Sequence, residues 1–235
     1  MTDIQRAWQA LARDPVLYVD MAEGLRRGTA RIIRAEANGL LLLNEAAGVY
    51  MLLSADAASA AGLIAGRSMR ALVVHEPHAL GPARALLGLG GVLRYHHARY
   101  APDAPAPERP VQGLEIRRLK AHDVGFVQMH YHSLDGEDYV RERIAAGAMF
   151  GAFLQGAIVG FIGEHDDGAI GMLSVVEAHR KQGIAYALER DAVRRALKEG
   201  KRPYCQVAEG NEASLHLQRK LGFSLSEASV VWMTE

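Results

Sequence analysis

The residues with the clearest chemical potential lie in one short segment, Arg180-Lys-Gln-Gly183-Ile-Ala185, after an apolar run that ends at Val176. Gly183 is expected to open a helix, and the first turn of a helix presents unpartnered backbone N–H groups and about half a positive charge. Gly183 and Ala185 have little or no side chain, so an anion can approach this backbone closely. Arg180 and Lys181 add positive charge. The segment therefore predicts an anion site that suits a pyrophosphate.

The helix expected over residues 184–199 supports this placement. It carries one apolar stripe that can pack on a sheet, made of Ile184, Ala185, Leu188, Ala192, Val193 and Ala196. A strand is expected before it and another after it, so its start falls at the ends of the strands, where open α/β sheets bind ligands. Taken alone, the segment is also explained by a tight strand–helix connection with solvated cations.

Two motifs carry a resemblance to a known family. The segment from Arg180 to Ala185 resembles the R/Q-x-x-G-x-G/A loop of the GCN5-related N-acetyltransferases (GNAT superfamily), with Val175 five residues before the arginine. Glu177 stands where the family usually has proline. The run from Asn211 to Phe223 resembles the family's N-x-x-A-…-K-L-G-F segment. The closer resemblance is to the glycine N-acyltransferase-like or FR47-like branch.

The resemblance implies a fold and a co-substrate: a mixed α+β sheet flanked by helices that binds acetyl-CoA or another acyl-CoA, without a metal. The main chain of Leu173, Val175 and Val176 would contact the acyl carbonyl and the pantetheine. Asn211 and Ser214 would lie along the pantetheine arm, although Asn211 is equally suited to be a simple helix N-cap. The pyrophosphate would be bound by the loop residues Arg180, Lys181, Gln182, Gly183, Ile184, Ala185 and Tyr186.

The implied reaction is direct attack of a substrate amine on the thioester. An alkyl ammonium must lose a proton first, so a proton acceptor is useful. Glu177 and Glu164 are the catalytic candidates, and His165, His179 and Glu209 are further ones; each is also explained as a loop side chain. The family often has a tyrosine that protonates the departing thiolate, and this chain has Gln218 at the matching position. Either another group protonates the thiolate or the thiolate leaves without a proton.

Proline divides the chain. Half of its eight prolines lie in residues 101–110, which predicts a semi-rigid linker between a domain over 1–100 and the acyltransferase domain over 111–235. The first domain is predicted to be α+β without a catalytic motif. It is interpreted as a degenerate copy of the same fold, as a wall of the acceptor cleft or as the basis of a homodimer. Its expected helices are 4–12, 54–64 and 83–89, and its strands are 31–35, 40–44, 49–53, 71–74 and 93–100.

The second domain has a clearer alternation of strands and helices. Strands are expected over residues 114–119, 149–154, 157–163, 169–176, 203–208 and 229–233, and helices over 123–131, 138–146, 184–199 and 211–221. Strand–helix alternation in its second half implies a partly parallel sheet with crossover helices.

Composition narrows the function classes. Acidic and basic residues balance at 27 each, so no nucleic-acid partner is expected. The single cysteine, Cys205, excludes a disulfide within the chain, and neither a signal-like start nor a membrane-length apolar run is present, which favours a cytoplasmic protein without a membrane partner. The leading prediction is transfer of an acetyl group to a small-molecule amine or amino acid. The alternatives are an acetyltransferase for protein N-termini or lysines, and an acyl-CoA sensor without turnover.

Overall fold

The computed structural model describes residues 1–101, 106–131 and 136–235 of the chain. These residues form two compact units that are interleaved in sequence. The first unit contains Met1–Arg99, Gln206–Gln218 and Ser224–Glu235, and the second contains Tyr100–Cys205 and Arg219–Phe223. In the described part of the chain, no helix has both the length and the apolar character needed to cross a membrane.

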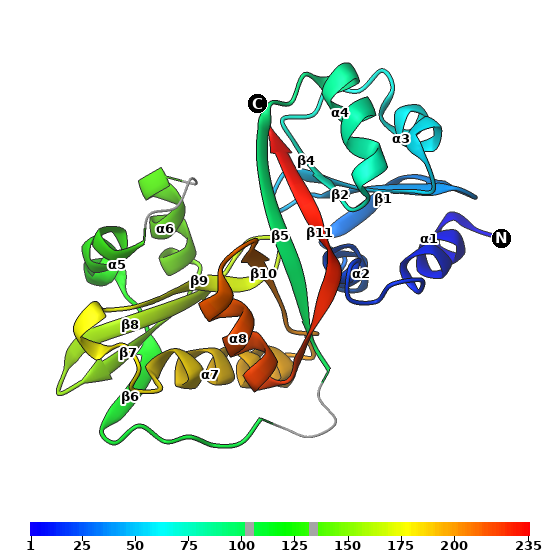
Figure 1. Ribbon diagram of the computed structural model, residues 1–235. Coiled ribbons are helices and arrows are strands. Elements are labelled where there is room, and N and C mark those ends of the chain that lie inside the picture. The colour runs from blue at the N-terminus through cyan, green and yellow to red at the C-terminus, as the bar shows by residue number, and fades with distance from the viewer. Residues whose placement is uncertain (102–105, 132–135) are drawn as a thin grey trace. The chain divides into compact units, whose positions relative to one another are not determined.

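The second unit is built on a mixed sheet with the strand order β10-β9-β8-β7-β6 (Figure 1). Neighbouring strands from β6 to β9 are antiparallel, whereas β9 and β10 are parallel with Cys205 opposite Ile170. Its elements are β6 (Leu114–Arg118), α5 (Val124–His130), α6 (Gly136–Ala145), β7 (Met149–Leu154), β8 (Ala157–Glu164), β9 (Ile170–Val175), α7 (Ile184–Lys198) and the start of β10 (Tyr204–Ala208). The boundary between the units cuts β10 and also α8 (Glu212–Leu221).

Helices cover both faces of this sheet (Figure 1). Helices α5 and α6 bury Val127, Val140 and their apolar neighbours against Met149 and Phe153 of β7. Phe150, which alternates with Met149 along β7, points to the other face, where the Arg195 guanidinium of α7 lies 3.5 Å from the centre of its ring. The predicted α+β fold with a mixed sheet flanked by helices is confirmed.

The first unit contains strands in the order β1-β2-β3-β4-β11-β5. Strands β1 to β3 are antiparallel neighbours, β3 and β4 are parallel, and β4 pairs antiparallel with β11, so the last strand of the chain lies beside a strand from its first third. The elements are α1 (Asp3–Leu11), α2 (Val19–Arg27), β1 (Ala30–Glu36), β2 (Gly39–Asn44), β3 (Val49–Ser54), α3 (Ala57–Ile64), β4 (Ala71–Val74), α4 (Leu80–Leu87), β5 (Gly91–Tyr100) and β11 (Phe223–Thr234).

The run of four leucines in β2 reflects burial on both faces of this sheet. Leu40 and Leu42 pack in one cluster with α1 and α2, whereas Leu41 packs in another with α3 and α4. A strand covered on both faces reads as a continuous apolar run instead of an alternating one. The sequence analysis did not predict α2, because its buried Asp20 and Glu23 interrupt the apolar pattern of an amphipathic helix.

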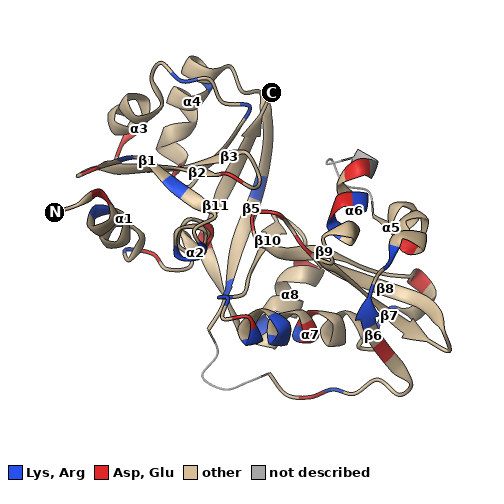
Figure 2. Ribbon diagram, turned by 180° about the vertical axis from the view of Figure 1, so that it is seen from behind, with Lys and Arg blue, Asp and Glu red and all other residues tan. Residues whose placement is uncertain are grey.

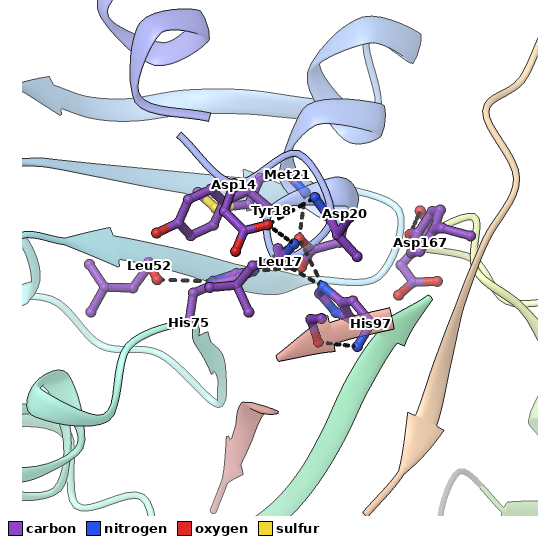
Figure 3. A network of polar contacts seen from close by, with 12 residues as sticks. Asp14, Leu17, Tyr18, Asp20, Met21, Leu52, His75, His97 and Asp167 are labelled. Atoms are coloured by element: carbon purple, nitrogen blue, oxygen red, sulfur yellow. Dashed lines mark hydrogen bonds and ion pairs between the residues drawn. The ribbon is translucent and has the colours of Figure 1, made fainter. Parts of the chain in front are cut away.

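Asp20 is part of a buried polar network at the centre of the first unit (Figure 3). Its carboxylate accepts a hydrogen bond from His75 Nε2 at 2.9 Å, and the Nδ1 atoms of His75 and His97 donate to the carbonyl oxygens of Leu52 and Leu17 at 3.0 and 2.7 Å. His75 therefore carries protons on both nitrogens. Burial opposes both charges, but their mutual attraction prevails, so the pKa of Asp20 is lowered and that of His75 is raised. The pair is a buried ion pair.

We expect Asp20→Asn to lower the free energy of unfolding by about 3 kcal/mol at pH 7, because it leaves a buried imidazolium without its counter-charge. Urea unfolding followed by circular dichroism measures the change. Asp3→Asn is the matched control: Asp3 pairs with Arg6 at 2.8 Å on the exposed face of α1, where such a pair contributes less than about 1 kcal/mol. Equal effects of the two substitutions would contradict the ion-pair assignment.

Candidate functional site

The loop before α7 adopts a backbone geometry that gathers N–H groups. Gly183 is the N-cap residue of the 15-residue helix α7, with φ 86° in the left-handed region and no side-chain cap. Lys181 is also left-handed, with φ 61°, while Gln182 between them is not. Alternation of handedness over consecutive residues directs successive N–H groups toward one point and forms a concavity for anions.

These donors are open. Within the described parts of the chain, no backbone N–H group from residue 181 to residue 186 donates a hydrogen bond to a protein group; the first N–H group bonded back into the helix is that of Ala187, which donates to Gly183 O at 3.0 Å. Lys181, Gln182 and Gly183 are exposed. Unpaired N–H groups at the positive end of a helix are the usual binding site for phosphate in proteins. The predicted anion loop therefore has the required donors.

The backbone conformation of Gly183 favours glycine. Any L-amino acid is strained at φ 86°, whereas a Cβ atom there would make only an ordinary contact with Val111 Cγ2 at 3.5 Å. The Arg180 side chain folds back on the strand, since its Nε donates to Val175 O at 3.2 Å. Of the predicted loop residues, Ile184 and Tyr186 are buried and Ala185 is half-buried, so only their backbone groups suit a ligand.

Residues 106–108 of the predicted linker make specific contacts with α7. The Tyr186 hydroxyl donates to Pro107 O at 2.8 Å, and Arg190 donates to Ala106 O at 3.2 Å and to the carboxylate of Glu108 at 2.9 Å. A cavity of about 290 Å³ lies between this segment and α7. Residues 102–105 of the predicted linker lie outside the described residues.

Strand β9 leads to this loop and carries a bulge. Phe161 of β8 is opposite Ser174 and Gly163 is opposite Gly171, so two residues of β9 face one residue of β8. Met172, one of these two residues, has φ 53°. A bulge leaves the extra residue out of the hydrogen-bonded ladder and re-aims the backbone. The second residue is Leu173, which was predicted to contact the acyl group.

The backbone N–H and C=O groups of Val176 are both hydrogen bonded within the protein. Its N–H group donates to Val159 O at 2.9 Å, and its carbonyl accepts from His179 N at 2.9 Å. Leu173 and Val175 are half-buried on β9 before this point. Of the three residues predicted to offer backbone N–H groups, Val176 therefore has its donor engaged within the protein.

The two predicted catalytic carboxylates do not come together. Glu164 ends β8, and its oxygens bond Lys201 Nζ at 2.8 and 2.9 Å. Glu177 is exposed in the short 3₁₀ turn Glu177–His179 that starts the loop before α7. A different cluster forms beyond the end of β8, where Tyr139 of α6 meets His165 and Asp166. The sequence analysis did not identify Tyr139, since no local pattern links residues so far apart in the chain.

Asn211 and Ser214 belong to the first unit. Asn211 Oδ1 accepts a hydrogen bond from Ser214 N at 3.1 Å, which is the geometry of an N-cap for α8. The capping interpretation of Asn211 is therefore confirmed, and it is compatible with a further contact to a ligand through the amide nitrogen.

A group of potential metal ligands is found in the first unit. Asp20, His75 and His97 place one ligand atom each within 4.8 Å of one another. Hydrogen bonds explain why these side chains lie together without a metal ion. Both Nδ1 atoms donate to backbone carbonyls, and His75 Nε2 donates to Asp20. The cluster is therefore explained as a buried ion pair beside a neutral histidine, whose pKa burial lowers.

Comparison with known proteins agrees with this geometry. Residues 116–223 match the model of the acetyltransferase (GNAT) family. A Drosophila protein of known structure is 13% identical over 100% of this chain and 96% of its own, with a TM-score of 0.71. A GCN5-related N-acetyltransferase-like protein from Streptococcus suis is 15% identical over the whole of both chains, with a TM-score of 0.56.

A GCN5-related N-acetyltransferase from Sphaerobacter thermophilus is 15% identical over 100% of this chain and 94% of its own, with a TM-score of 0.53. At these identities the solved structures establish the fold. Among curated proteins, no sequence matches the chain. The family match covers β6 to α8 and includes the loop before α7 with its open N–H groups. Residues 116–223 therefore form a domain that matches the acetyltransferase (GNAT) family.

Proposed function

We propose that the protein transfers an acyl group, most simply acetyl, from acyl-CoA to the primary amine of a small molecule or an amino acid. The observation that carries the proposal is the row of open backbone N–H groups from residue 181 to residue 186 at the start of α7. A CoA diphosphate is the part of the co-substrate that such a row would bind. Hydrogen bonds to a charged acceptor are roughly twice as strong as neutral ones.

Charge at the loop supports the same ligand. Lys181 is exposed beside the open donors, and Arg180 is held at the end of β9 by its bond to Val175 O. In the ribbon coloured by charge, the basic residues of α7 itself lie in its second half, away from the loop (Figure 2). A diphosphate bound at Gln182 and Gly183 would direct the pantetheine arm along β9. Asn211 and Ser214 stay proposals for contacts with that arm.

The bulge of β9 is the proposed position of the thioester. The carbonyl oxygen becomes negatively charged when an amine attacks, and backbone N–H groups of Leu173 and Val175 would stabilise that charge. Direct attack forms the new C–N bond and breaks the C–S bond without an acyl-enzyme intermediate. Cys205, buried and with its pKa raised by burial and by Glu189, is a poor nucleophile, which favours direct attack.

The predicted carboxylates fit this arrangement unequally. Glu177 lies on the diphosphate side of β9, whereas the thioester would be separated from the diphosphate by the length of the pantetheine arm. Glu164 lies at the opposite end of the strand pair but is held by Lys201. Both stay proposals for the proton acceptor.

Binding of the diphosphate is tested with an isosteric pair of variants. Gln182→Glu adds a negative charge at the open donors without a change of size, and we expect it to weaken acetyl-CoA binding about tenfold through repulsion, equivalent to about 1.4 kcal/mol. Gln155→Glu makes the same chemical change in the exposed turn between β7 and β8 and should leave the affinity unchanged. Isothermal titration calorimetry measures both. Equal affinities of wild type and Gln182→Glu would remove this loop from the site.

Transfer itself is tested by thiol release. We expect incubation with acetyl-CoA and a panel of small amines, amino acids and peptides to release CoA thiol with at least one small amine, detected with a chromogenic disulfide. Release with peptides alone would favour the protein N-terminus or lysine as acceptor. Tight acetyl-CoA binding without release from any acceptor would contradict transfer and favour a sensor, for which Gln218 at the family's tyrosine position is the supporting feature.

A further inference from the structure

We propose that His165 accepts the proton of the substrate amine and that Tyr139 and Asp166 hold it in the tautomer this task requires. The inference deepens the proposed acyl transfer and rests on it. The three side chains are half-buried at the turn between β8 and β9, in contact with α6.

The hydrogen bonds of the Tyr139 hydroxyl determine the tautomer. The hydroxyl has one proton, and its bond to Asp166 Oδ1 at 3.3 Å uses it, because a carboxylate can only accept. The same oxygen accepts the Asp166 backbone N–H at 3.4 Å and lies 2.8 Å from His165 Nδ1. With the Tyr139 proton in this bond to Asp166, as proposed here, Nδ1 is the donor in its contact with the hydroxyl oxygen. A neutral His165 then has its lone pair on Nε2.

The Tyr139 proton is securely held. Burial, with the negative charge of Asp166 as the next cause, raises the pKa of the Tyr139 phenol above its usual range, so the phenol does not ionise near neutral pH. Arg143 and Asp167 are the other charged residues that act on the ring. The Tyr139 and His165 rings are stacked with centres 5.8 Å apart, which restricts rotation of the imidazole.

The turn also fixes the His165 backbone. Its N–H group donates to Ala169 O at 2.8 Å and its carbonyl accepts from Gly168 N at 3.0 Å. A residue fixed at both its backbone and its side chain presents its remaining nitrogen in one direction. This is the positioning that a proton acceptor needs.

Nε2 faces the strand proposed to hold the thioester. A Cβ atom on Gly171 of β9 would lie 2.8 Å from His165 Nε2, so the ring lies directly over this glycine. Gly171 precedes the bulge residue Met172, and Leu173 follows two residues on, about 7 Å along an extended strand. A short chain of ordered waters can bridge such a gap between a base and an amine. A larger side chain at position 171 would occupy the place of the imidazole.

The substrate amine enters the reaction as an ammonium. The ammonium gives a proton to Nε2, directly or through ordered water, and the imidazolium then releases this proton to solvent. The freed nitrogen lone pair attacks the thioester carbonyl carbon, the C–N bond forms and the C–S bond breaks. The second N–H proton leaves with the collapse of the tetrahedral intermediate and is available, through the same imidazole, to protonate the departing CoA thiolate.

The test uses the full chain with an amine found to support thiol release. We expect His165→Gln to lower kcat about 100-fold with unchanged acetyl-CoA affinity, and the loss to shrink as pH rises and the amine deprotonates in solution. Tyr139→Phe, a positioning variant, should lower kcat less and alter the pH–rate profile. His122→Gln, an exposed histidine before α5, is the matched control and should retain full activity.

A second measurement does not depend on turnover. Long-range ¹H–¹⁵N correlation spectra of the imidazole report which nitrogen carries the proton, and we expect Nδ1 in the wild type and a mixture in Tyr139→Phe. A proton on Nε2 in the wild type, or full kcat in His165→Gln, would overturn the role of His165 alone. Acetyl-CoA binding without release from any amine would overturn the proposed transfer and this role with it.

Discussion

An unpaired row of backbone donors at the start of α7 is the constraint on which the rest of the second unit depends. The first N–H groups of any helix lack intrahelical partners, and a sharp turn before the helix keeps them away from carbonyls of the preceding loop. Gly183 provides this turn through its left-handed φ, and Lys181 adopts the same region two residues earlier. The helix behind the loop is held on the sheet by its apolar stripe. The N–H groups at the start of α7 therefore point in a fixed direction.

Strand β9 connects this point to the rest of the proposed site. Its bulge at Met172 and Leu173 interrupts the pairing with β8, which releases backbone groups in the middle of the sheet. The residue before the bulge is a glycine with an imidazole over it, and the residue after the strand has its N–H group engaged by Val159. The strand therefore differs along its length: its ladder with β8 is interrupted at the bulge, whereas the N–H group of Val176 after its end is bonded within the protein.

The two units use buried polar groups in different ways. In the first unit, Asp20 and His75 neutralise each other completely inside the core, and neither faces an opening among the described residues. A satisfied buried pair contributes to a unique packing arrangement more than to chemistry. In the second unit, the Tyr139 hydroxyl is hydrogen bonded to Asp166 and to Nδ1 of His165. The other ring nitrogen of His165, Nε2, lies over Gly171 of β9. In the tautomer proposed for His165, the second arrangement leaves Nε2 as a proton acceptor beside β9.

Much of the fold and part of the site follow from local sequence. The glycine at the loop and the apolar stripe of α7 are features of contiguous residues, so the start of α7 at Ile184 was predicted correctly and its end to within one residue. The hairpin of β7 and β8 followed from Gln155 and Gly156, which both take positive φ. Helix α2 could not be predicted, because its buried acids have partners elsewhere in the chain; only Gly28, left-handed at its end, signals it.

The tertiary structure alone decided which polar groups meet. Asp20 and His75 are 55 positions apart, Tyr139 and His165 are 26 apart, and Tyr186 and Pro107 are 79 apart, so no periodicity in the sequence relates them. It also decided that Val176 N–H is engaged and that Glu164 bonds Lys201. Local conformation is encoded by neighbouring residues, whereas the partner of a side chain depends on how the distant elements pack. The sequence therefore determined the class of chemistry, and the folded chain determined which atoms are placed to perform it.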